Sequence, residues 1–237
     1  MDTALLRRID ALDWPSIEAD LDAWGAARTG PLLDEPACAE LAGAYGAPEL
    51  FRSRVVMARH GFGQGEYQYF TYPLPPMVAA LRTSLYPQLA AVANRWASAL
   101  RQDHRFPDRH ADYLQRCRAV GQARPTPLLL RYGPGDYNRL HQDLYGPEVF
   151  PLQLTILLSR PGMDFDGGEF VLTEQRARMQ SRAEVVPLQL GEGVIFPVRE
   201  RPLQGPRGTQ RALMRHGVSR IRSGGRLALG IIFHDAP

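Results

Sequence analysis

The sequence predicts a mainly β protein with additional helices, in which short strands form a sandwich, jelly roll or barrel that N-terminal helices support. Three observations lead to this prediction. From Thr126 onward the 237-residue chain alternates short apolar runs with Gly, Pro and Asp, as all-β domains do. Before that point, apolar residues recur at helical spacing. No repeat or low-complexity linker divides the chain, so residues 1–237 are expected to form a single domain, with 1–125 as mainly helical support and 126–237 as the β core.

Four helices are expected in the first half of the chain, because apolar residues recur there every three or four positions. Asp13 and Asp34 each stand just before one of these segments, where a carboxylate can cap the first turn of a helix. Pro75 and Pro76 introduce the longest segment, whose apolar residues fall on one side. The expected helices are residues 14–24, 35–45, 77–99 and 110–120.

Residues 54–72 alternate well enough to form two strands, joined by the stretch Gly61-Phe62-Gly63-Gln64-Gly65. A glycine-rich stretch typically cradles a phosphate where a strand leads directly into a helix, and that context is missing from this part of the sequence. A flexible hairpin turn is therefore favoured over phosphate binding.

Seven strands are expected in the second half, each a short apolar run bounded by turn residues. Their even spacing is typical of a sandwich, jelly roll or barrel. They are residues 128–132, 152–159, 169–173, 183–188, 193–196, 213–216 and 226–234.

Charge is distributed unevenly along the chain, which has a net charge of +3, a pI near 9.1 and no lysine. Residues 9–40 contain eight acids and one arginine, whereas residues 199–226 contain eight arginines and one acid. A one-sided basic region attracts phosphate or carboxylate groups. The basic half is therefore expected to form a phosphate-binding rim, or else the solvated face of an arginine-biased protein. The rim candidates are Arg176, Arg178, Arg182, Arg199, Arg201, Arg207, Arg211 and Arg215.

The N-terminal segment MDTALLRRIDALDWPSIEADLDAW contains acidic residues among its apolar positions. It has no uninterrupted apolar run, so neither a signal peptide nor a membrane span is expected. Cys38 and Cys117 are too few for a zinc cluster and lack the spacing of a redox motif. We therefore expect two buried cysteines in a soluble protein of the reducing cytoplasm.

The segment LLLRYGPGDYNRLHQDLYG places His141 two residues before Asp143. Positions i and i+2 of a strand share a face, so the imidazole and the carboxylate can converge on one metal ion. By itself the pair is equally consistent with a surface turn. His216 supplies a third ligand, and two histidines with one carboxylate form the set that non-haem Fe(II) oxygenases use. His234 is the substitute third ligand, although its place near the C-terminus favours an ordinary strand-end histidine.

Arg226 lies ten residues after His216, at the start of the last expected strand. Both faces of that strand are largely apolar, so the arginine is expected to be buried, and a buried guanidinium requires an anion. A planar, two-pronged partner of this kind suits the far carboxylate of 2-oxoglutarate. Arg220 and Arg222 compete for that role, but both are expected in an exposed loop.

An ordered set of motifs in the second half of the chain resembles the motifs of a known superfamily. The set comprises Tyr132-x-Pro134-Gly135, His141-x-Asp143, Gly167-Gly168-Glu169, Gly191-x-x-x-x-Phe196, and His216 with Arg226 ten residues later. Their order and spacing are similar to those of the Fe(II)- and 2-oxoglutarate-dependent dioxygenases, over about the last hundred residues.

The resemblance implies a double-stranded β-helix, a jelly-roll or cupin-like fold, with a metal at its open end. It further implies that His141, Asp143 and His216 bind Fe(II) and that Arg226 binds the cosubstrate 2-oxoglutarate. Tyr132, nine residues before the first ligand, is expected to face the cosubstrate. Dioxygen would take the remaining iron position.

The branch of the superfamily is indicated by three further similarities. The run RYGPGDYNRLHQD is similar in spacing to AlkB-type nucleic-acid demethylases, whereas the ten-residue step from His216 to Arg226 resembles the prolyl hydroxylases. The segments DFDGGEFVLTEQRARMQSR and GIIFHDAP resemble a bacterial oxygenase family that is grouped with enzymes of damaged nucleic acid.

Two substrate classes follow from these similarities. One is alkylated DNA or RNA, hydroxylated or oxidatively demethylated after a base is flipped into the pocket. The other is a peptide or small molecule, hydroxylated as by a prolyl hydroxylase. A non-catalytic jelly-roll binding protein is a third possibility, against which the intact ligand set argues.

Overall fold

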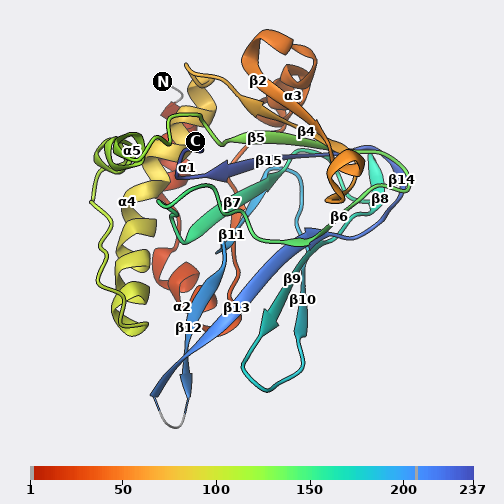
Figure 1. Ribbon diagram of the computed structural model, residues 1–237. Coiled ribbons are helices and arrows are strands. Elements are labelled where there is room, and N and C mark those ends of the chain that lie inside the picture. Colours follow the sequence, from red (N-terminus) through yellow and green to blue (C-terminus); the bar gives the residue numbers. More distant parts are fainter. Residues whose placement is uncertain (1–2, 206–207) are drawn as a thin grey trace.

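The computed structural model describes residues 3–205 and 208–237, and it contains two large antiparallel sheets that face one another, with helices along one side (Figure 1). The first sheet has seven strands in the order β1-β11-β7-β15-β5-β4-β2. The second has six, in the order β10-β9-β13-β6-β3, with β12 paired to β13. This is the double-stranded β-helix that the sequence resemblance implied, in a mainly β protein with helices.

The N-terminal part of the chain supplies most of the helices and four strands. Asp13 and Asp34 cap their helices as predicted, since each side chain accepts a hydrogen bond from the backbone N–H three residues later. The elements are α1 (Thr3–Asp10), α2 (Trp14–Trp24), β1 (Ala27–Pro31), α3 (Glu35–Gly43), β2 (Phe51–Val56), β3 (Gly63–Gln64), β4 (Glu66–Phe70), α4 (Pro76–Ala99) and α5 (His110–Ala119).

The C-terminal part supplies the other strands of both sheets. They are β5 (Leu128–Tyr132), β6 (Tyr137–His141), β7 (Leu152–Leu157), β8 (Phe165–Gly167), β9 (Phe170–Gln175), β10 (Arg182–Val186), β11 (Glu192–Pro197), β12 (Glu200–Gly205), β13 (Gly208–Val218), β14 (Ile221–Gly224) and β15 (Arg226–Ile232). Strands β8 and β14 form a small separate sheet.

All four expected helices and all seven expected C-terminal strands are present, with ends shifted by a few residues. The segment before α4 contributes four strands rather than the predicted two, because β1 and β3 were not predicted. Helix α1 and strands β6, β8, β12 and β14 were not predicted either. The stretch Gly61–65 lies, as predicted, between two antiparallel paired strands, β2 and β4. It is more than a hairpin turn, since it contains β3, which pairs with β6 (Gly63↔Asn138). This pairing joins the loop to the strand that ends at His141.

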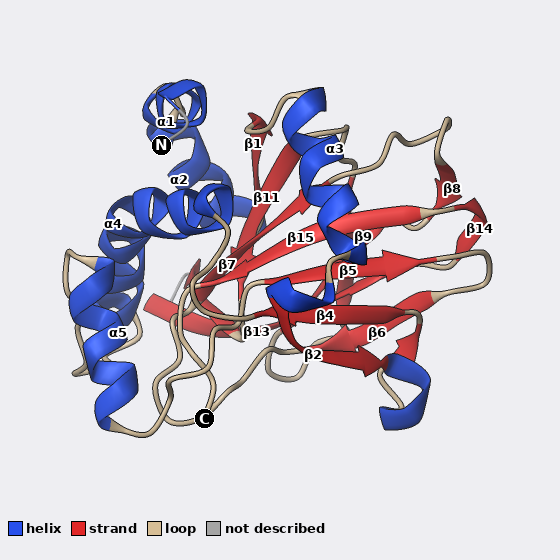
Figure 2. Cartoon of the chain, turned by 90° about the horizontal axis from the view of Figure 1, so that it is seen from above, coloured by secondary structure: helices blue, strands red, loops and turns tan. Residues whose placement is uncertain are grey.

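The helices cover the outer face of the seven-stranded sheet (Figure 2), and the residues that alternate along its strands explain why. Leu152, Leu154 and Ile156 of β7 belong to the hydrophobic core that also contains the buried side of α4. Gln153 and Thr155, at the positions between them, line a cavity on the opposite face. The period of two in a strand thus separates a helix-facing core from a cavity that lies between the two sheets.

Candidate metal centre and cosubstrate pocket

The cavity between the sheets has a volume of about 210 Å³ and is lined mainly by apolar and aromatic side chains. The seven-stranded sheet contributes residues from β4, β5, β7 and β15, and the six-stranded sheet contributes residues from β6, β9 and β13. All five sequence-predicted site residues lie in its wall: Tyr132, His141, Asp143, His216 and Arg226.

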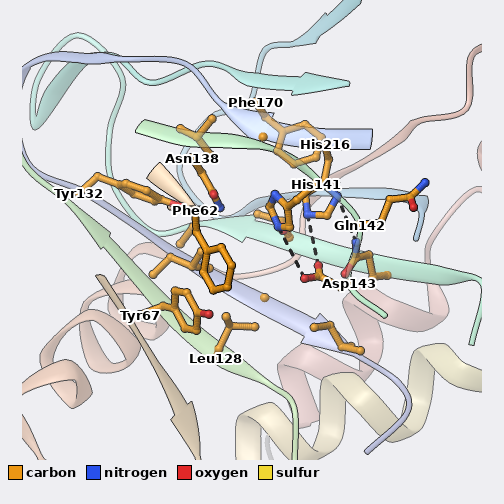
Figure 3. Close-up of a pocket in the computed structure, with 18 of the residues that line it drawn as sticks. Phe62, Tyr67, Leu128, Tyr132, Asn138, His141, Gln142, Asp143, Phe170 and His216 are labelled. Atoms are coloured by element: carbon orange, nitrogen blue, oxygen red, sulfur yellow. Dashed lines mark hydrogen bonds and ion pairs between the residues drawn. The ribbon is translucent and has the colours of Figure 1, made fainter. Parts of the chain in front are cut away.

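Two paired strands bring the candidate metal ligands together. His141 is the last residue of β6, and it lies directly opposite His216 on β13, with ring centroids 4.2 Å apart. Asp143 follows two residues later, beyond the end of β6. The expectation that His141 and Asp143 lie on one strand was therefore wrong, because only His141 lies on it. Figure 3 shows the three side chains converging on one point.

The donor atoms of this group have the arrangement of a metal site. Asp143 faces both imidazoles: Oδ2 lies 3.3 Å from Nε2 of His216, and Oδ1 lies 3.6 Å from Nε2 of His141. One ligand atom from each residue lies within 4.8 Å of the others. Two imidazole nitrogens and one carboxylate oxygen fit Fe(II), because they bind it and leave coordination positions open.

Neighbouring groups fix the orientation of two of the ligands. Nδ1 of His141 lies 2.7 Å from the carbonyl of Arg139, so its proton is directed at that carbonyl and Nε2 keeps its lone pair for a metal. The hydroxyl of Tyr145 donates to Asp143 Oδ1 at 3.0 Å. That hydroxyl also lies 2.8 Å from the hydroxyl of Tyr69. Both tyrosines line the cavity.

The pKa shifts of Asp143 and His216 favour their metal-binding forms, whereas that of His141 favours its protonated form in the absence of a metal. Burial would raise the pKa of Asp143, but the hydrogen bonds and charges of His141 and His216 together outweigh it and hold that pKa well below its usual range. Burial, with the charge of His141, lowers the pKa of His216. Burial opposes protonation of His141 too, yet the hydrogen bond and charge of Asp143 raise its pKa. At neutral pH the carboxylate is ionised and His216 is neutral, as metal ligation requires.

Arg226 also lines the cavity, is 2% exposed and is directly paired across β15 and β5 with Tyr132, which Figure 3 shows on the far side of the cavity from Asp143. Within the described part of the chain the guanidinium has no hydrogen bond or ion pair, and its Nε is buried without a partner. Its neighbours are the rings of Tyr132 and Phe165, 5.6 and 5.9 Å from Cζ. Burial lowers the pKa of Arg226, and the charges of Tyr132 and Glu169 oppose this only in part, since neither residue forms a hydrogen bond or ion pair with it. A guanidinium nevertheless remains charged in proteins. The side chain is thus a buried cation that requires an anion.

Gly168 allows the Arg226 side chain to pass. Its backbone has a φ of +63°, and a Cβ at this position would lie 2.2 Å from Ile221 Cδ1 and 3.0 Å from Arg226 Cδ. A glycine is required there both for backbone conformation and for space.

The other candidates from the sequence lie elsewhere. His234 is buried outside the cavity wall, and its Nδ1 accepts the backbone N–H of Phe150. Arg220 and Arg222 are exposed, as expected, but Arg222 lies on β14 rather than in a loop. Cys38 and Cys117 are buried and free.

One arginine of the predicted rim is buried, and the prediction was wrong for it. Other members are exposed but lie at separate positions. Arg201 is fully buried and forms an ion pair with Glu174, which also binds Arg176. Arg207 lies outside the described residues. The remaining candidates are exposed at other positions of the six-stranded sheet and its connections: Arg178, Arg182, Arg199, Arg211 and Arg215.

Several cavity residues were not predicted from the sequence. Phe62 follows η3 (Met57–His60), is 46% exposed at the cavity and stacks on His60. Figure 3 places it near Tyr67 and Leu128, across the cavity from Asp143. Gln153 was the most accessible to prediction, because in the mainly apolar run LQLTIL it is the residue with the most polar side chain. Tyr67, Tyr69 and Tyr145 carried no comparable signal.

Fold and donor set together are those of the 2OG-Fe(II) oxygenases, a class of oxidoreductases whose cofactors and cosubstrates are Fe(II), 2-oxoglutarate and dioxygen. Within this class the chain belongs to the Oxygenase-NA family, which residues 65–236 match. The family is described as an oxygenase that catalyses oxidative methylation of damaged DNA.

Relatives extend the match. An uncharacterized protein of Mycobacterium tuberculosis is 48% identical over 167 residues, which cover 70% of this chain and 72% of that protein. A segment of the alanine–tRNA ligase of Bordetella bronchiseptica is 30% identical over 148 residues, 62% of this chain but 16% of the ligase.

Solved structures share the fold at low sequence identity. An oxidoreductase of the 2OG-Fe(II) oxygenase family from Burkholderia pseudomallei has a TM-score of 0.56 at 14% identity, covering 94% of this chain and 92% of that one. A prolyl-4-hydroxylase from Pseudomonas putida has a TM-score of 0.54 at 16% identity, covering 94% and 99%.

No helix in the described ranges has both the length and the apolar character needed to cross a membrane.

Proposed function

We propose that this protein is an Fe(II)- and 2-oxoglutarate-dependent dioxygenase that oxidises alkylated nucleic acid. The observation that carries the reaction class is a single cavity whose wall contains both a His-Asp-His group and an unpaired, buried guanidinium. His141, Asp143 and His216 would hold the iron. Arg226 would bind the distal carboxylate of 2-oxoglutarate, with Tyr132 beside it.

When bound, iron and 2-oxoglutarate supply the oxidising power: dioxygen is consumed, 2-oxoglutarate becomes succinate and carbon dioxide, and one oxygen atom enters a substrate C–H bond. The chain's own residues orient the reactants. Arg226 holds the cosubstrate by charge-assisted hydrogen bonds in a site with little access to water. The apolar wall formed by Leu128, Leu130 and Val218 limits water around the reacting carbon.

The family description supports damaged nucleic acid as the substrate. If the oxidised carbon is a methyl group on a base nitrogen, hydroxylation gives an N-hydroxymethyl product, which releases formaldehyde and restores the N–H. The cavity is large enough for a planar base edge and lined by aromatic rings, as pockets for flipped bases are.

The surroundings of Phe62 support the same substrate. Its carbonyl accepts the backbone N–H of Arg139 at 2.9 Å, which ties the exposed ring to β6 just before His141. Arg59, three residues earlier in η3, and Arg139 are both exposed, and neither has an ion pair among the described residues. An aromatic ring with two exposed arginines near its backbone, one in sequence and one across a backbone hydrogen bond, suits stacking of a base and contact with phosphates.

A succinate-release assay tests the proposal. The purified protein is supplied with Fe(II), 2-oxoglutarate and single-stranded DNA or RNA that carries a base methylated on a ring nitrogen, with the unmethylated strand as the matched control. We expect succinate and formaldehyde in equal amounts from the methylated strand only, and none with His216→Ala. Wild-type protein that releases no succinate under any condition, with or without substrate, would reject the enzymatic function.

The RNA arm is included because a segment of an alanine–tRNA ligase is similar to this chain. Turnover of methylated RNA with no turnover of DNA would assign the enzyme to RNA.

A peptide hydroxylase is the second candidate, favoured by the ten-residue step from His216 to Arg226 and by the fold shared with a prolyl-4-hydroxylase. A proline-rich peptide in the same assay distinguishes the two. Succinate release that the peptide stimulates and both nucleic acids fail to stimulate would replace the nucleic-acid proposal with this one.

A further inference from the structure

Gln153 is a buried polar residue that the reaction as described does not use. It lies on β7, is 2% exposed and lines the cavity. Its amide nitrogen is 3.5 Å from Nδ1 of His216. No other hydrogen bond of this side chain is found among residues 3–205 and 208–237, so His216 is its one hydrogen-bond partner there.

The contact conflicts with metal binding if the amide keeps this orientation. Nε2 of His216 faces Asp143, so a metal held there requires the lone pair of Nε2, and the ring proton then lies on Nδ1. Two donors, the amide NH₂ and Nδ1–H, would face each other. A half-turn of the amide removes the conflict, since the oxygen and nitrogen of a glutamine side chain occupy nearly the same volume.

We propose that Gln153 is a positioning residue for His216, and that its amide oxygen accepts Nδ1–H when the metal is bound. The other ligand histidine has the equivalent arrangement, because Nδ1 of His141 lies 2.7 Å from the carbonyl of Arg139. Each imidazole would then have an acceptor behind it that fixes the tautomer and the ring plane. The inference rests on the metal site of the proposed function but does not depend on the substrate.

Two variants of Gln153 test whether its side chain acts on His216 as a hydrogen-bond acceptor or only fills space as an amide. Gln153→Met keeps the volume and removes the acceptor. Gln153→Glu keeps an acceptor oxygen and has no amide N–H to donate. If the amide oxygen is the active group, the glutamate variant retains metal binding and the methionine variant loses it; a donor role would make both variants fail.

Gln68 provides the matched control. It is 9% exposed on β4, and its amide donates to the carbonyl of Tyr45 on the other side of the sheet, away from the metal group. Gln68→Met removes a buried amide without touching His216.

The experiment measures Co(II) affinity of each purified protein by titration calorimetry at pH 7.5, with the thermal unfolding of the metal-free protein as a check on folding. We expect Gln153→Met to bind Co(II) about 10- to 100-fold more weakly than wild type. Gln153→Glu and Gln68→Met should stay within about threefold of wild type.

Wild-type affinity in Gln153→Met, or equal losses in the methionine and glutamate variants, would overturn the proposal. If Gln153→Met does not fold, Gln153→Glu decides alone, because loss of Co(II) binding by a folded acceptor-only variant contradicts the acceptor role. Failure of wild type itself to bind Co(II) would instead count against the metal site of the proposed function.

Discussion

Arg201 and Arg226 are both almost completely buried in the same protein, yet their surroundings are opposite. Arg201 forms an ion pair with Glu174 and donates to the carbonyls of Asp22 and Ala23. Arg226 has two aromatic rings near it and, among the described residues, no acceptor. The first arginine connects α2 to the six-stranded sheet, whereas the second faces the cavity.

The difference shows how a structural arginine can be told from a binding arginine. A buried cation is tolerated when a carboxylate compensates it, and removing one partner then leaves the other charge buried without compensation. A buried cation without a partner destabilises the fold, and an anion that binds there removes the penalty. Stability should therefore depend on Arg201, and cosubstrate binding on Arg226.

Arg226→Met tests the binding side of this comparison and should have the largest effect. Loss of two charge-assisted hydrogen bonds, each about 1.5–3 kcal/mol, should weaken 2-oxoglutarate binding by about 10²- to 10⁴-fold. The free energy of unfolding of the cosubstrate-free protein should stay equal or rise, since an uncompensated charge is removed. Calorimetric titration and urea unfolding measure the two quantities, and an unchanged affinity for 2-oxoglutarate would end the assignment of Arg226.

Arg201→Met tests the structural side. It leaves the carboxylate of Glu174, which is 4% exposed, without its buried partner. Breaking a buried pair in this way costs about 3–5 kcal/mol of unfolding free energy. Because Arg201 lies outside the cavity wall, the 2-oxoglutarate affinity of the folded fraction should equal that of wild type. A variant that weakens 2-oxoglutarate binding as much as Arg226→Met would show that the two arginines are not separable.

The sequence could separate these two arginines only in part. Arg226 was predicted to be buried because it begins an apolar strand, and it was predicted to bind the cosubstrate because it lies ten residues after His216. Arg201 was placed on an exposed rim, because its partner Glu174 is 27 residues away in the sequence and is brought near only by the pairing of β12, β13 and β9. When two ion-pair partners are brought together by the pairing of distant strands, the sequence around each residue does not indicate the other.

The same reasoning explains which elements were missed. Strand β6 has the sequence YNRLH, with polar residues on both faces and no buried position, so no period of two marks it. The N-terminal part of β13 is exposed at four successive residues, and only its apolar end was predicted. By contrast β5, with the sequence LLLRY, was predicted to the residue, because burial on the core side leaves a run of leucines.

The histidines offer a parallel comparison, because His110 and His234 are buried in the core whereas His141 and His216 face the cavity. Burial, with the charge of Arg82, lowers the pKa of both His110 and His234 to about 3. As the pH falls below the ordinary value of 6.5, the unfolded chain takes up protons that the folded protein does not. Stability is therefore complete above pH 6.5 and is lost as the pH falls toward 3, by about 1.4 kcal/mol per pH unit for each histidine.

Urea unfolding between pH 7.5 and 5.5 measures this loss, and His110→Gln sharpens it. Nε2 of His110 lies 2.8 Å from the carbonyl of Phe233, and glutamine can still donate to that carbonyl without titrating. The pH dependence of unfolding should fall in the variant by the share of one histidine, about 1.4 kcal/mol per pH unit, since one of the buried titrating groups is gone. An unchanged slope would show that His110 does not remain neutral in the folded protein.

The smallest expected effect concerns the binding of nucleic acid by exposed arginines. Two such arginines carry the same charge, so a difference between them must come from their positions. Arg139→Gln removes a cation from the β6 residue whose backbone N–H donates to the carbonyl of Phe62. Arg118→Gln removes one on α5, which lies on the opposite side of the molecule from β6 in both views (Figures 1 and 2). Both arginines are exposed, so both changes alter the net charge equally at little structural expense. If a single strand of nucleic acid passes the mouth of the cavity at Phe62, the slope of log Kd against log salt should fall by about 0.7 for Arg139→Gln, the value for one phosphate contact. It should stay unchanged for Arg118→Gln. Equal slopes in the two variants would mean that the binding of nucleic acid depends only on net charge. Arg139 would then contribute no more to binding than Arg118 on α5.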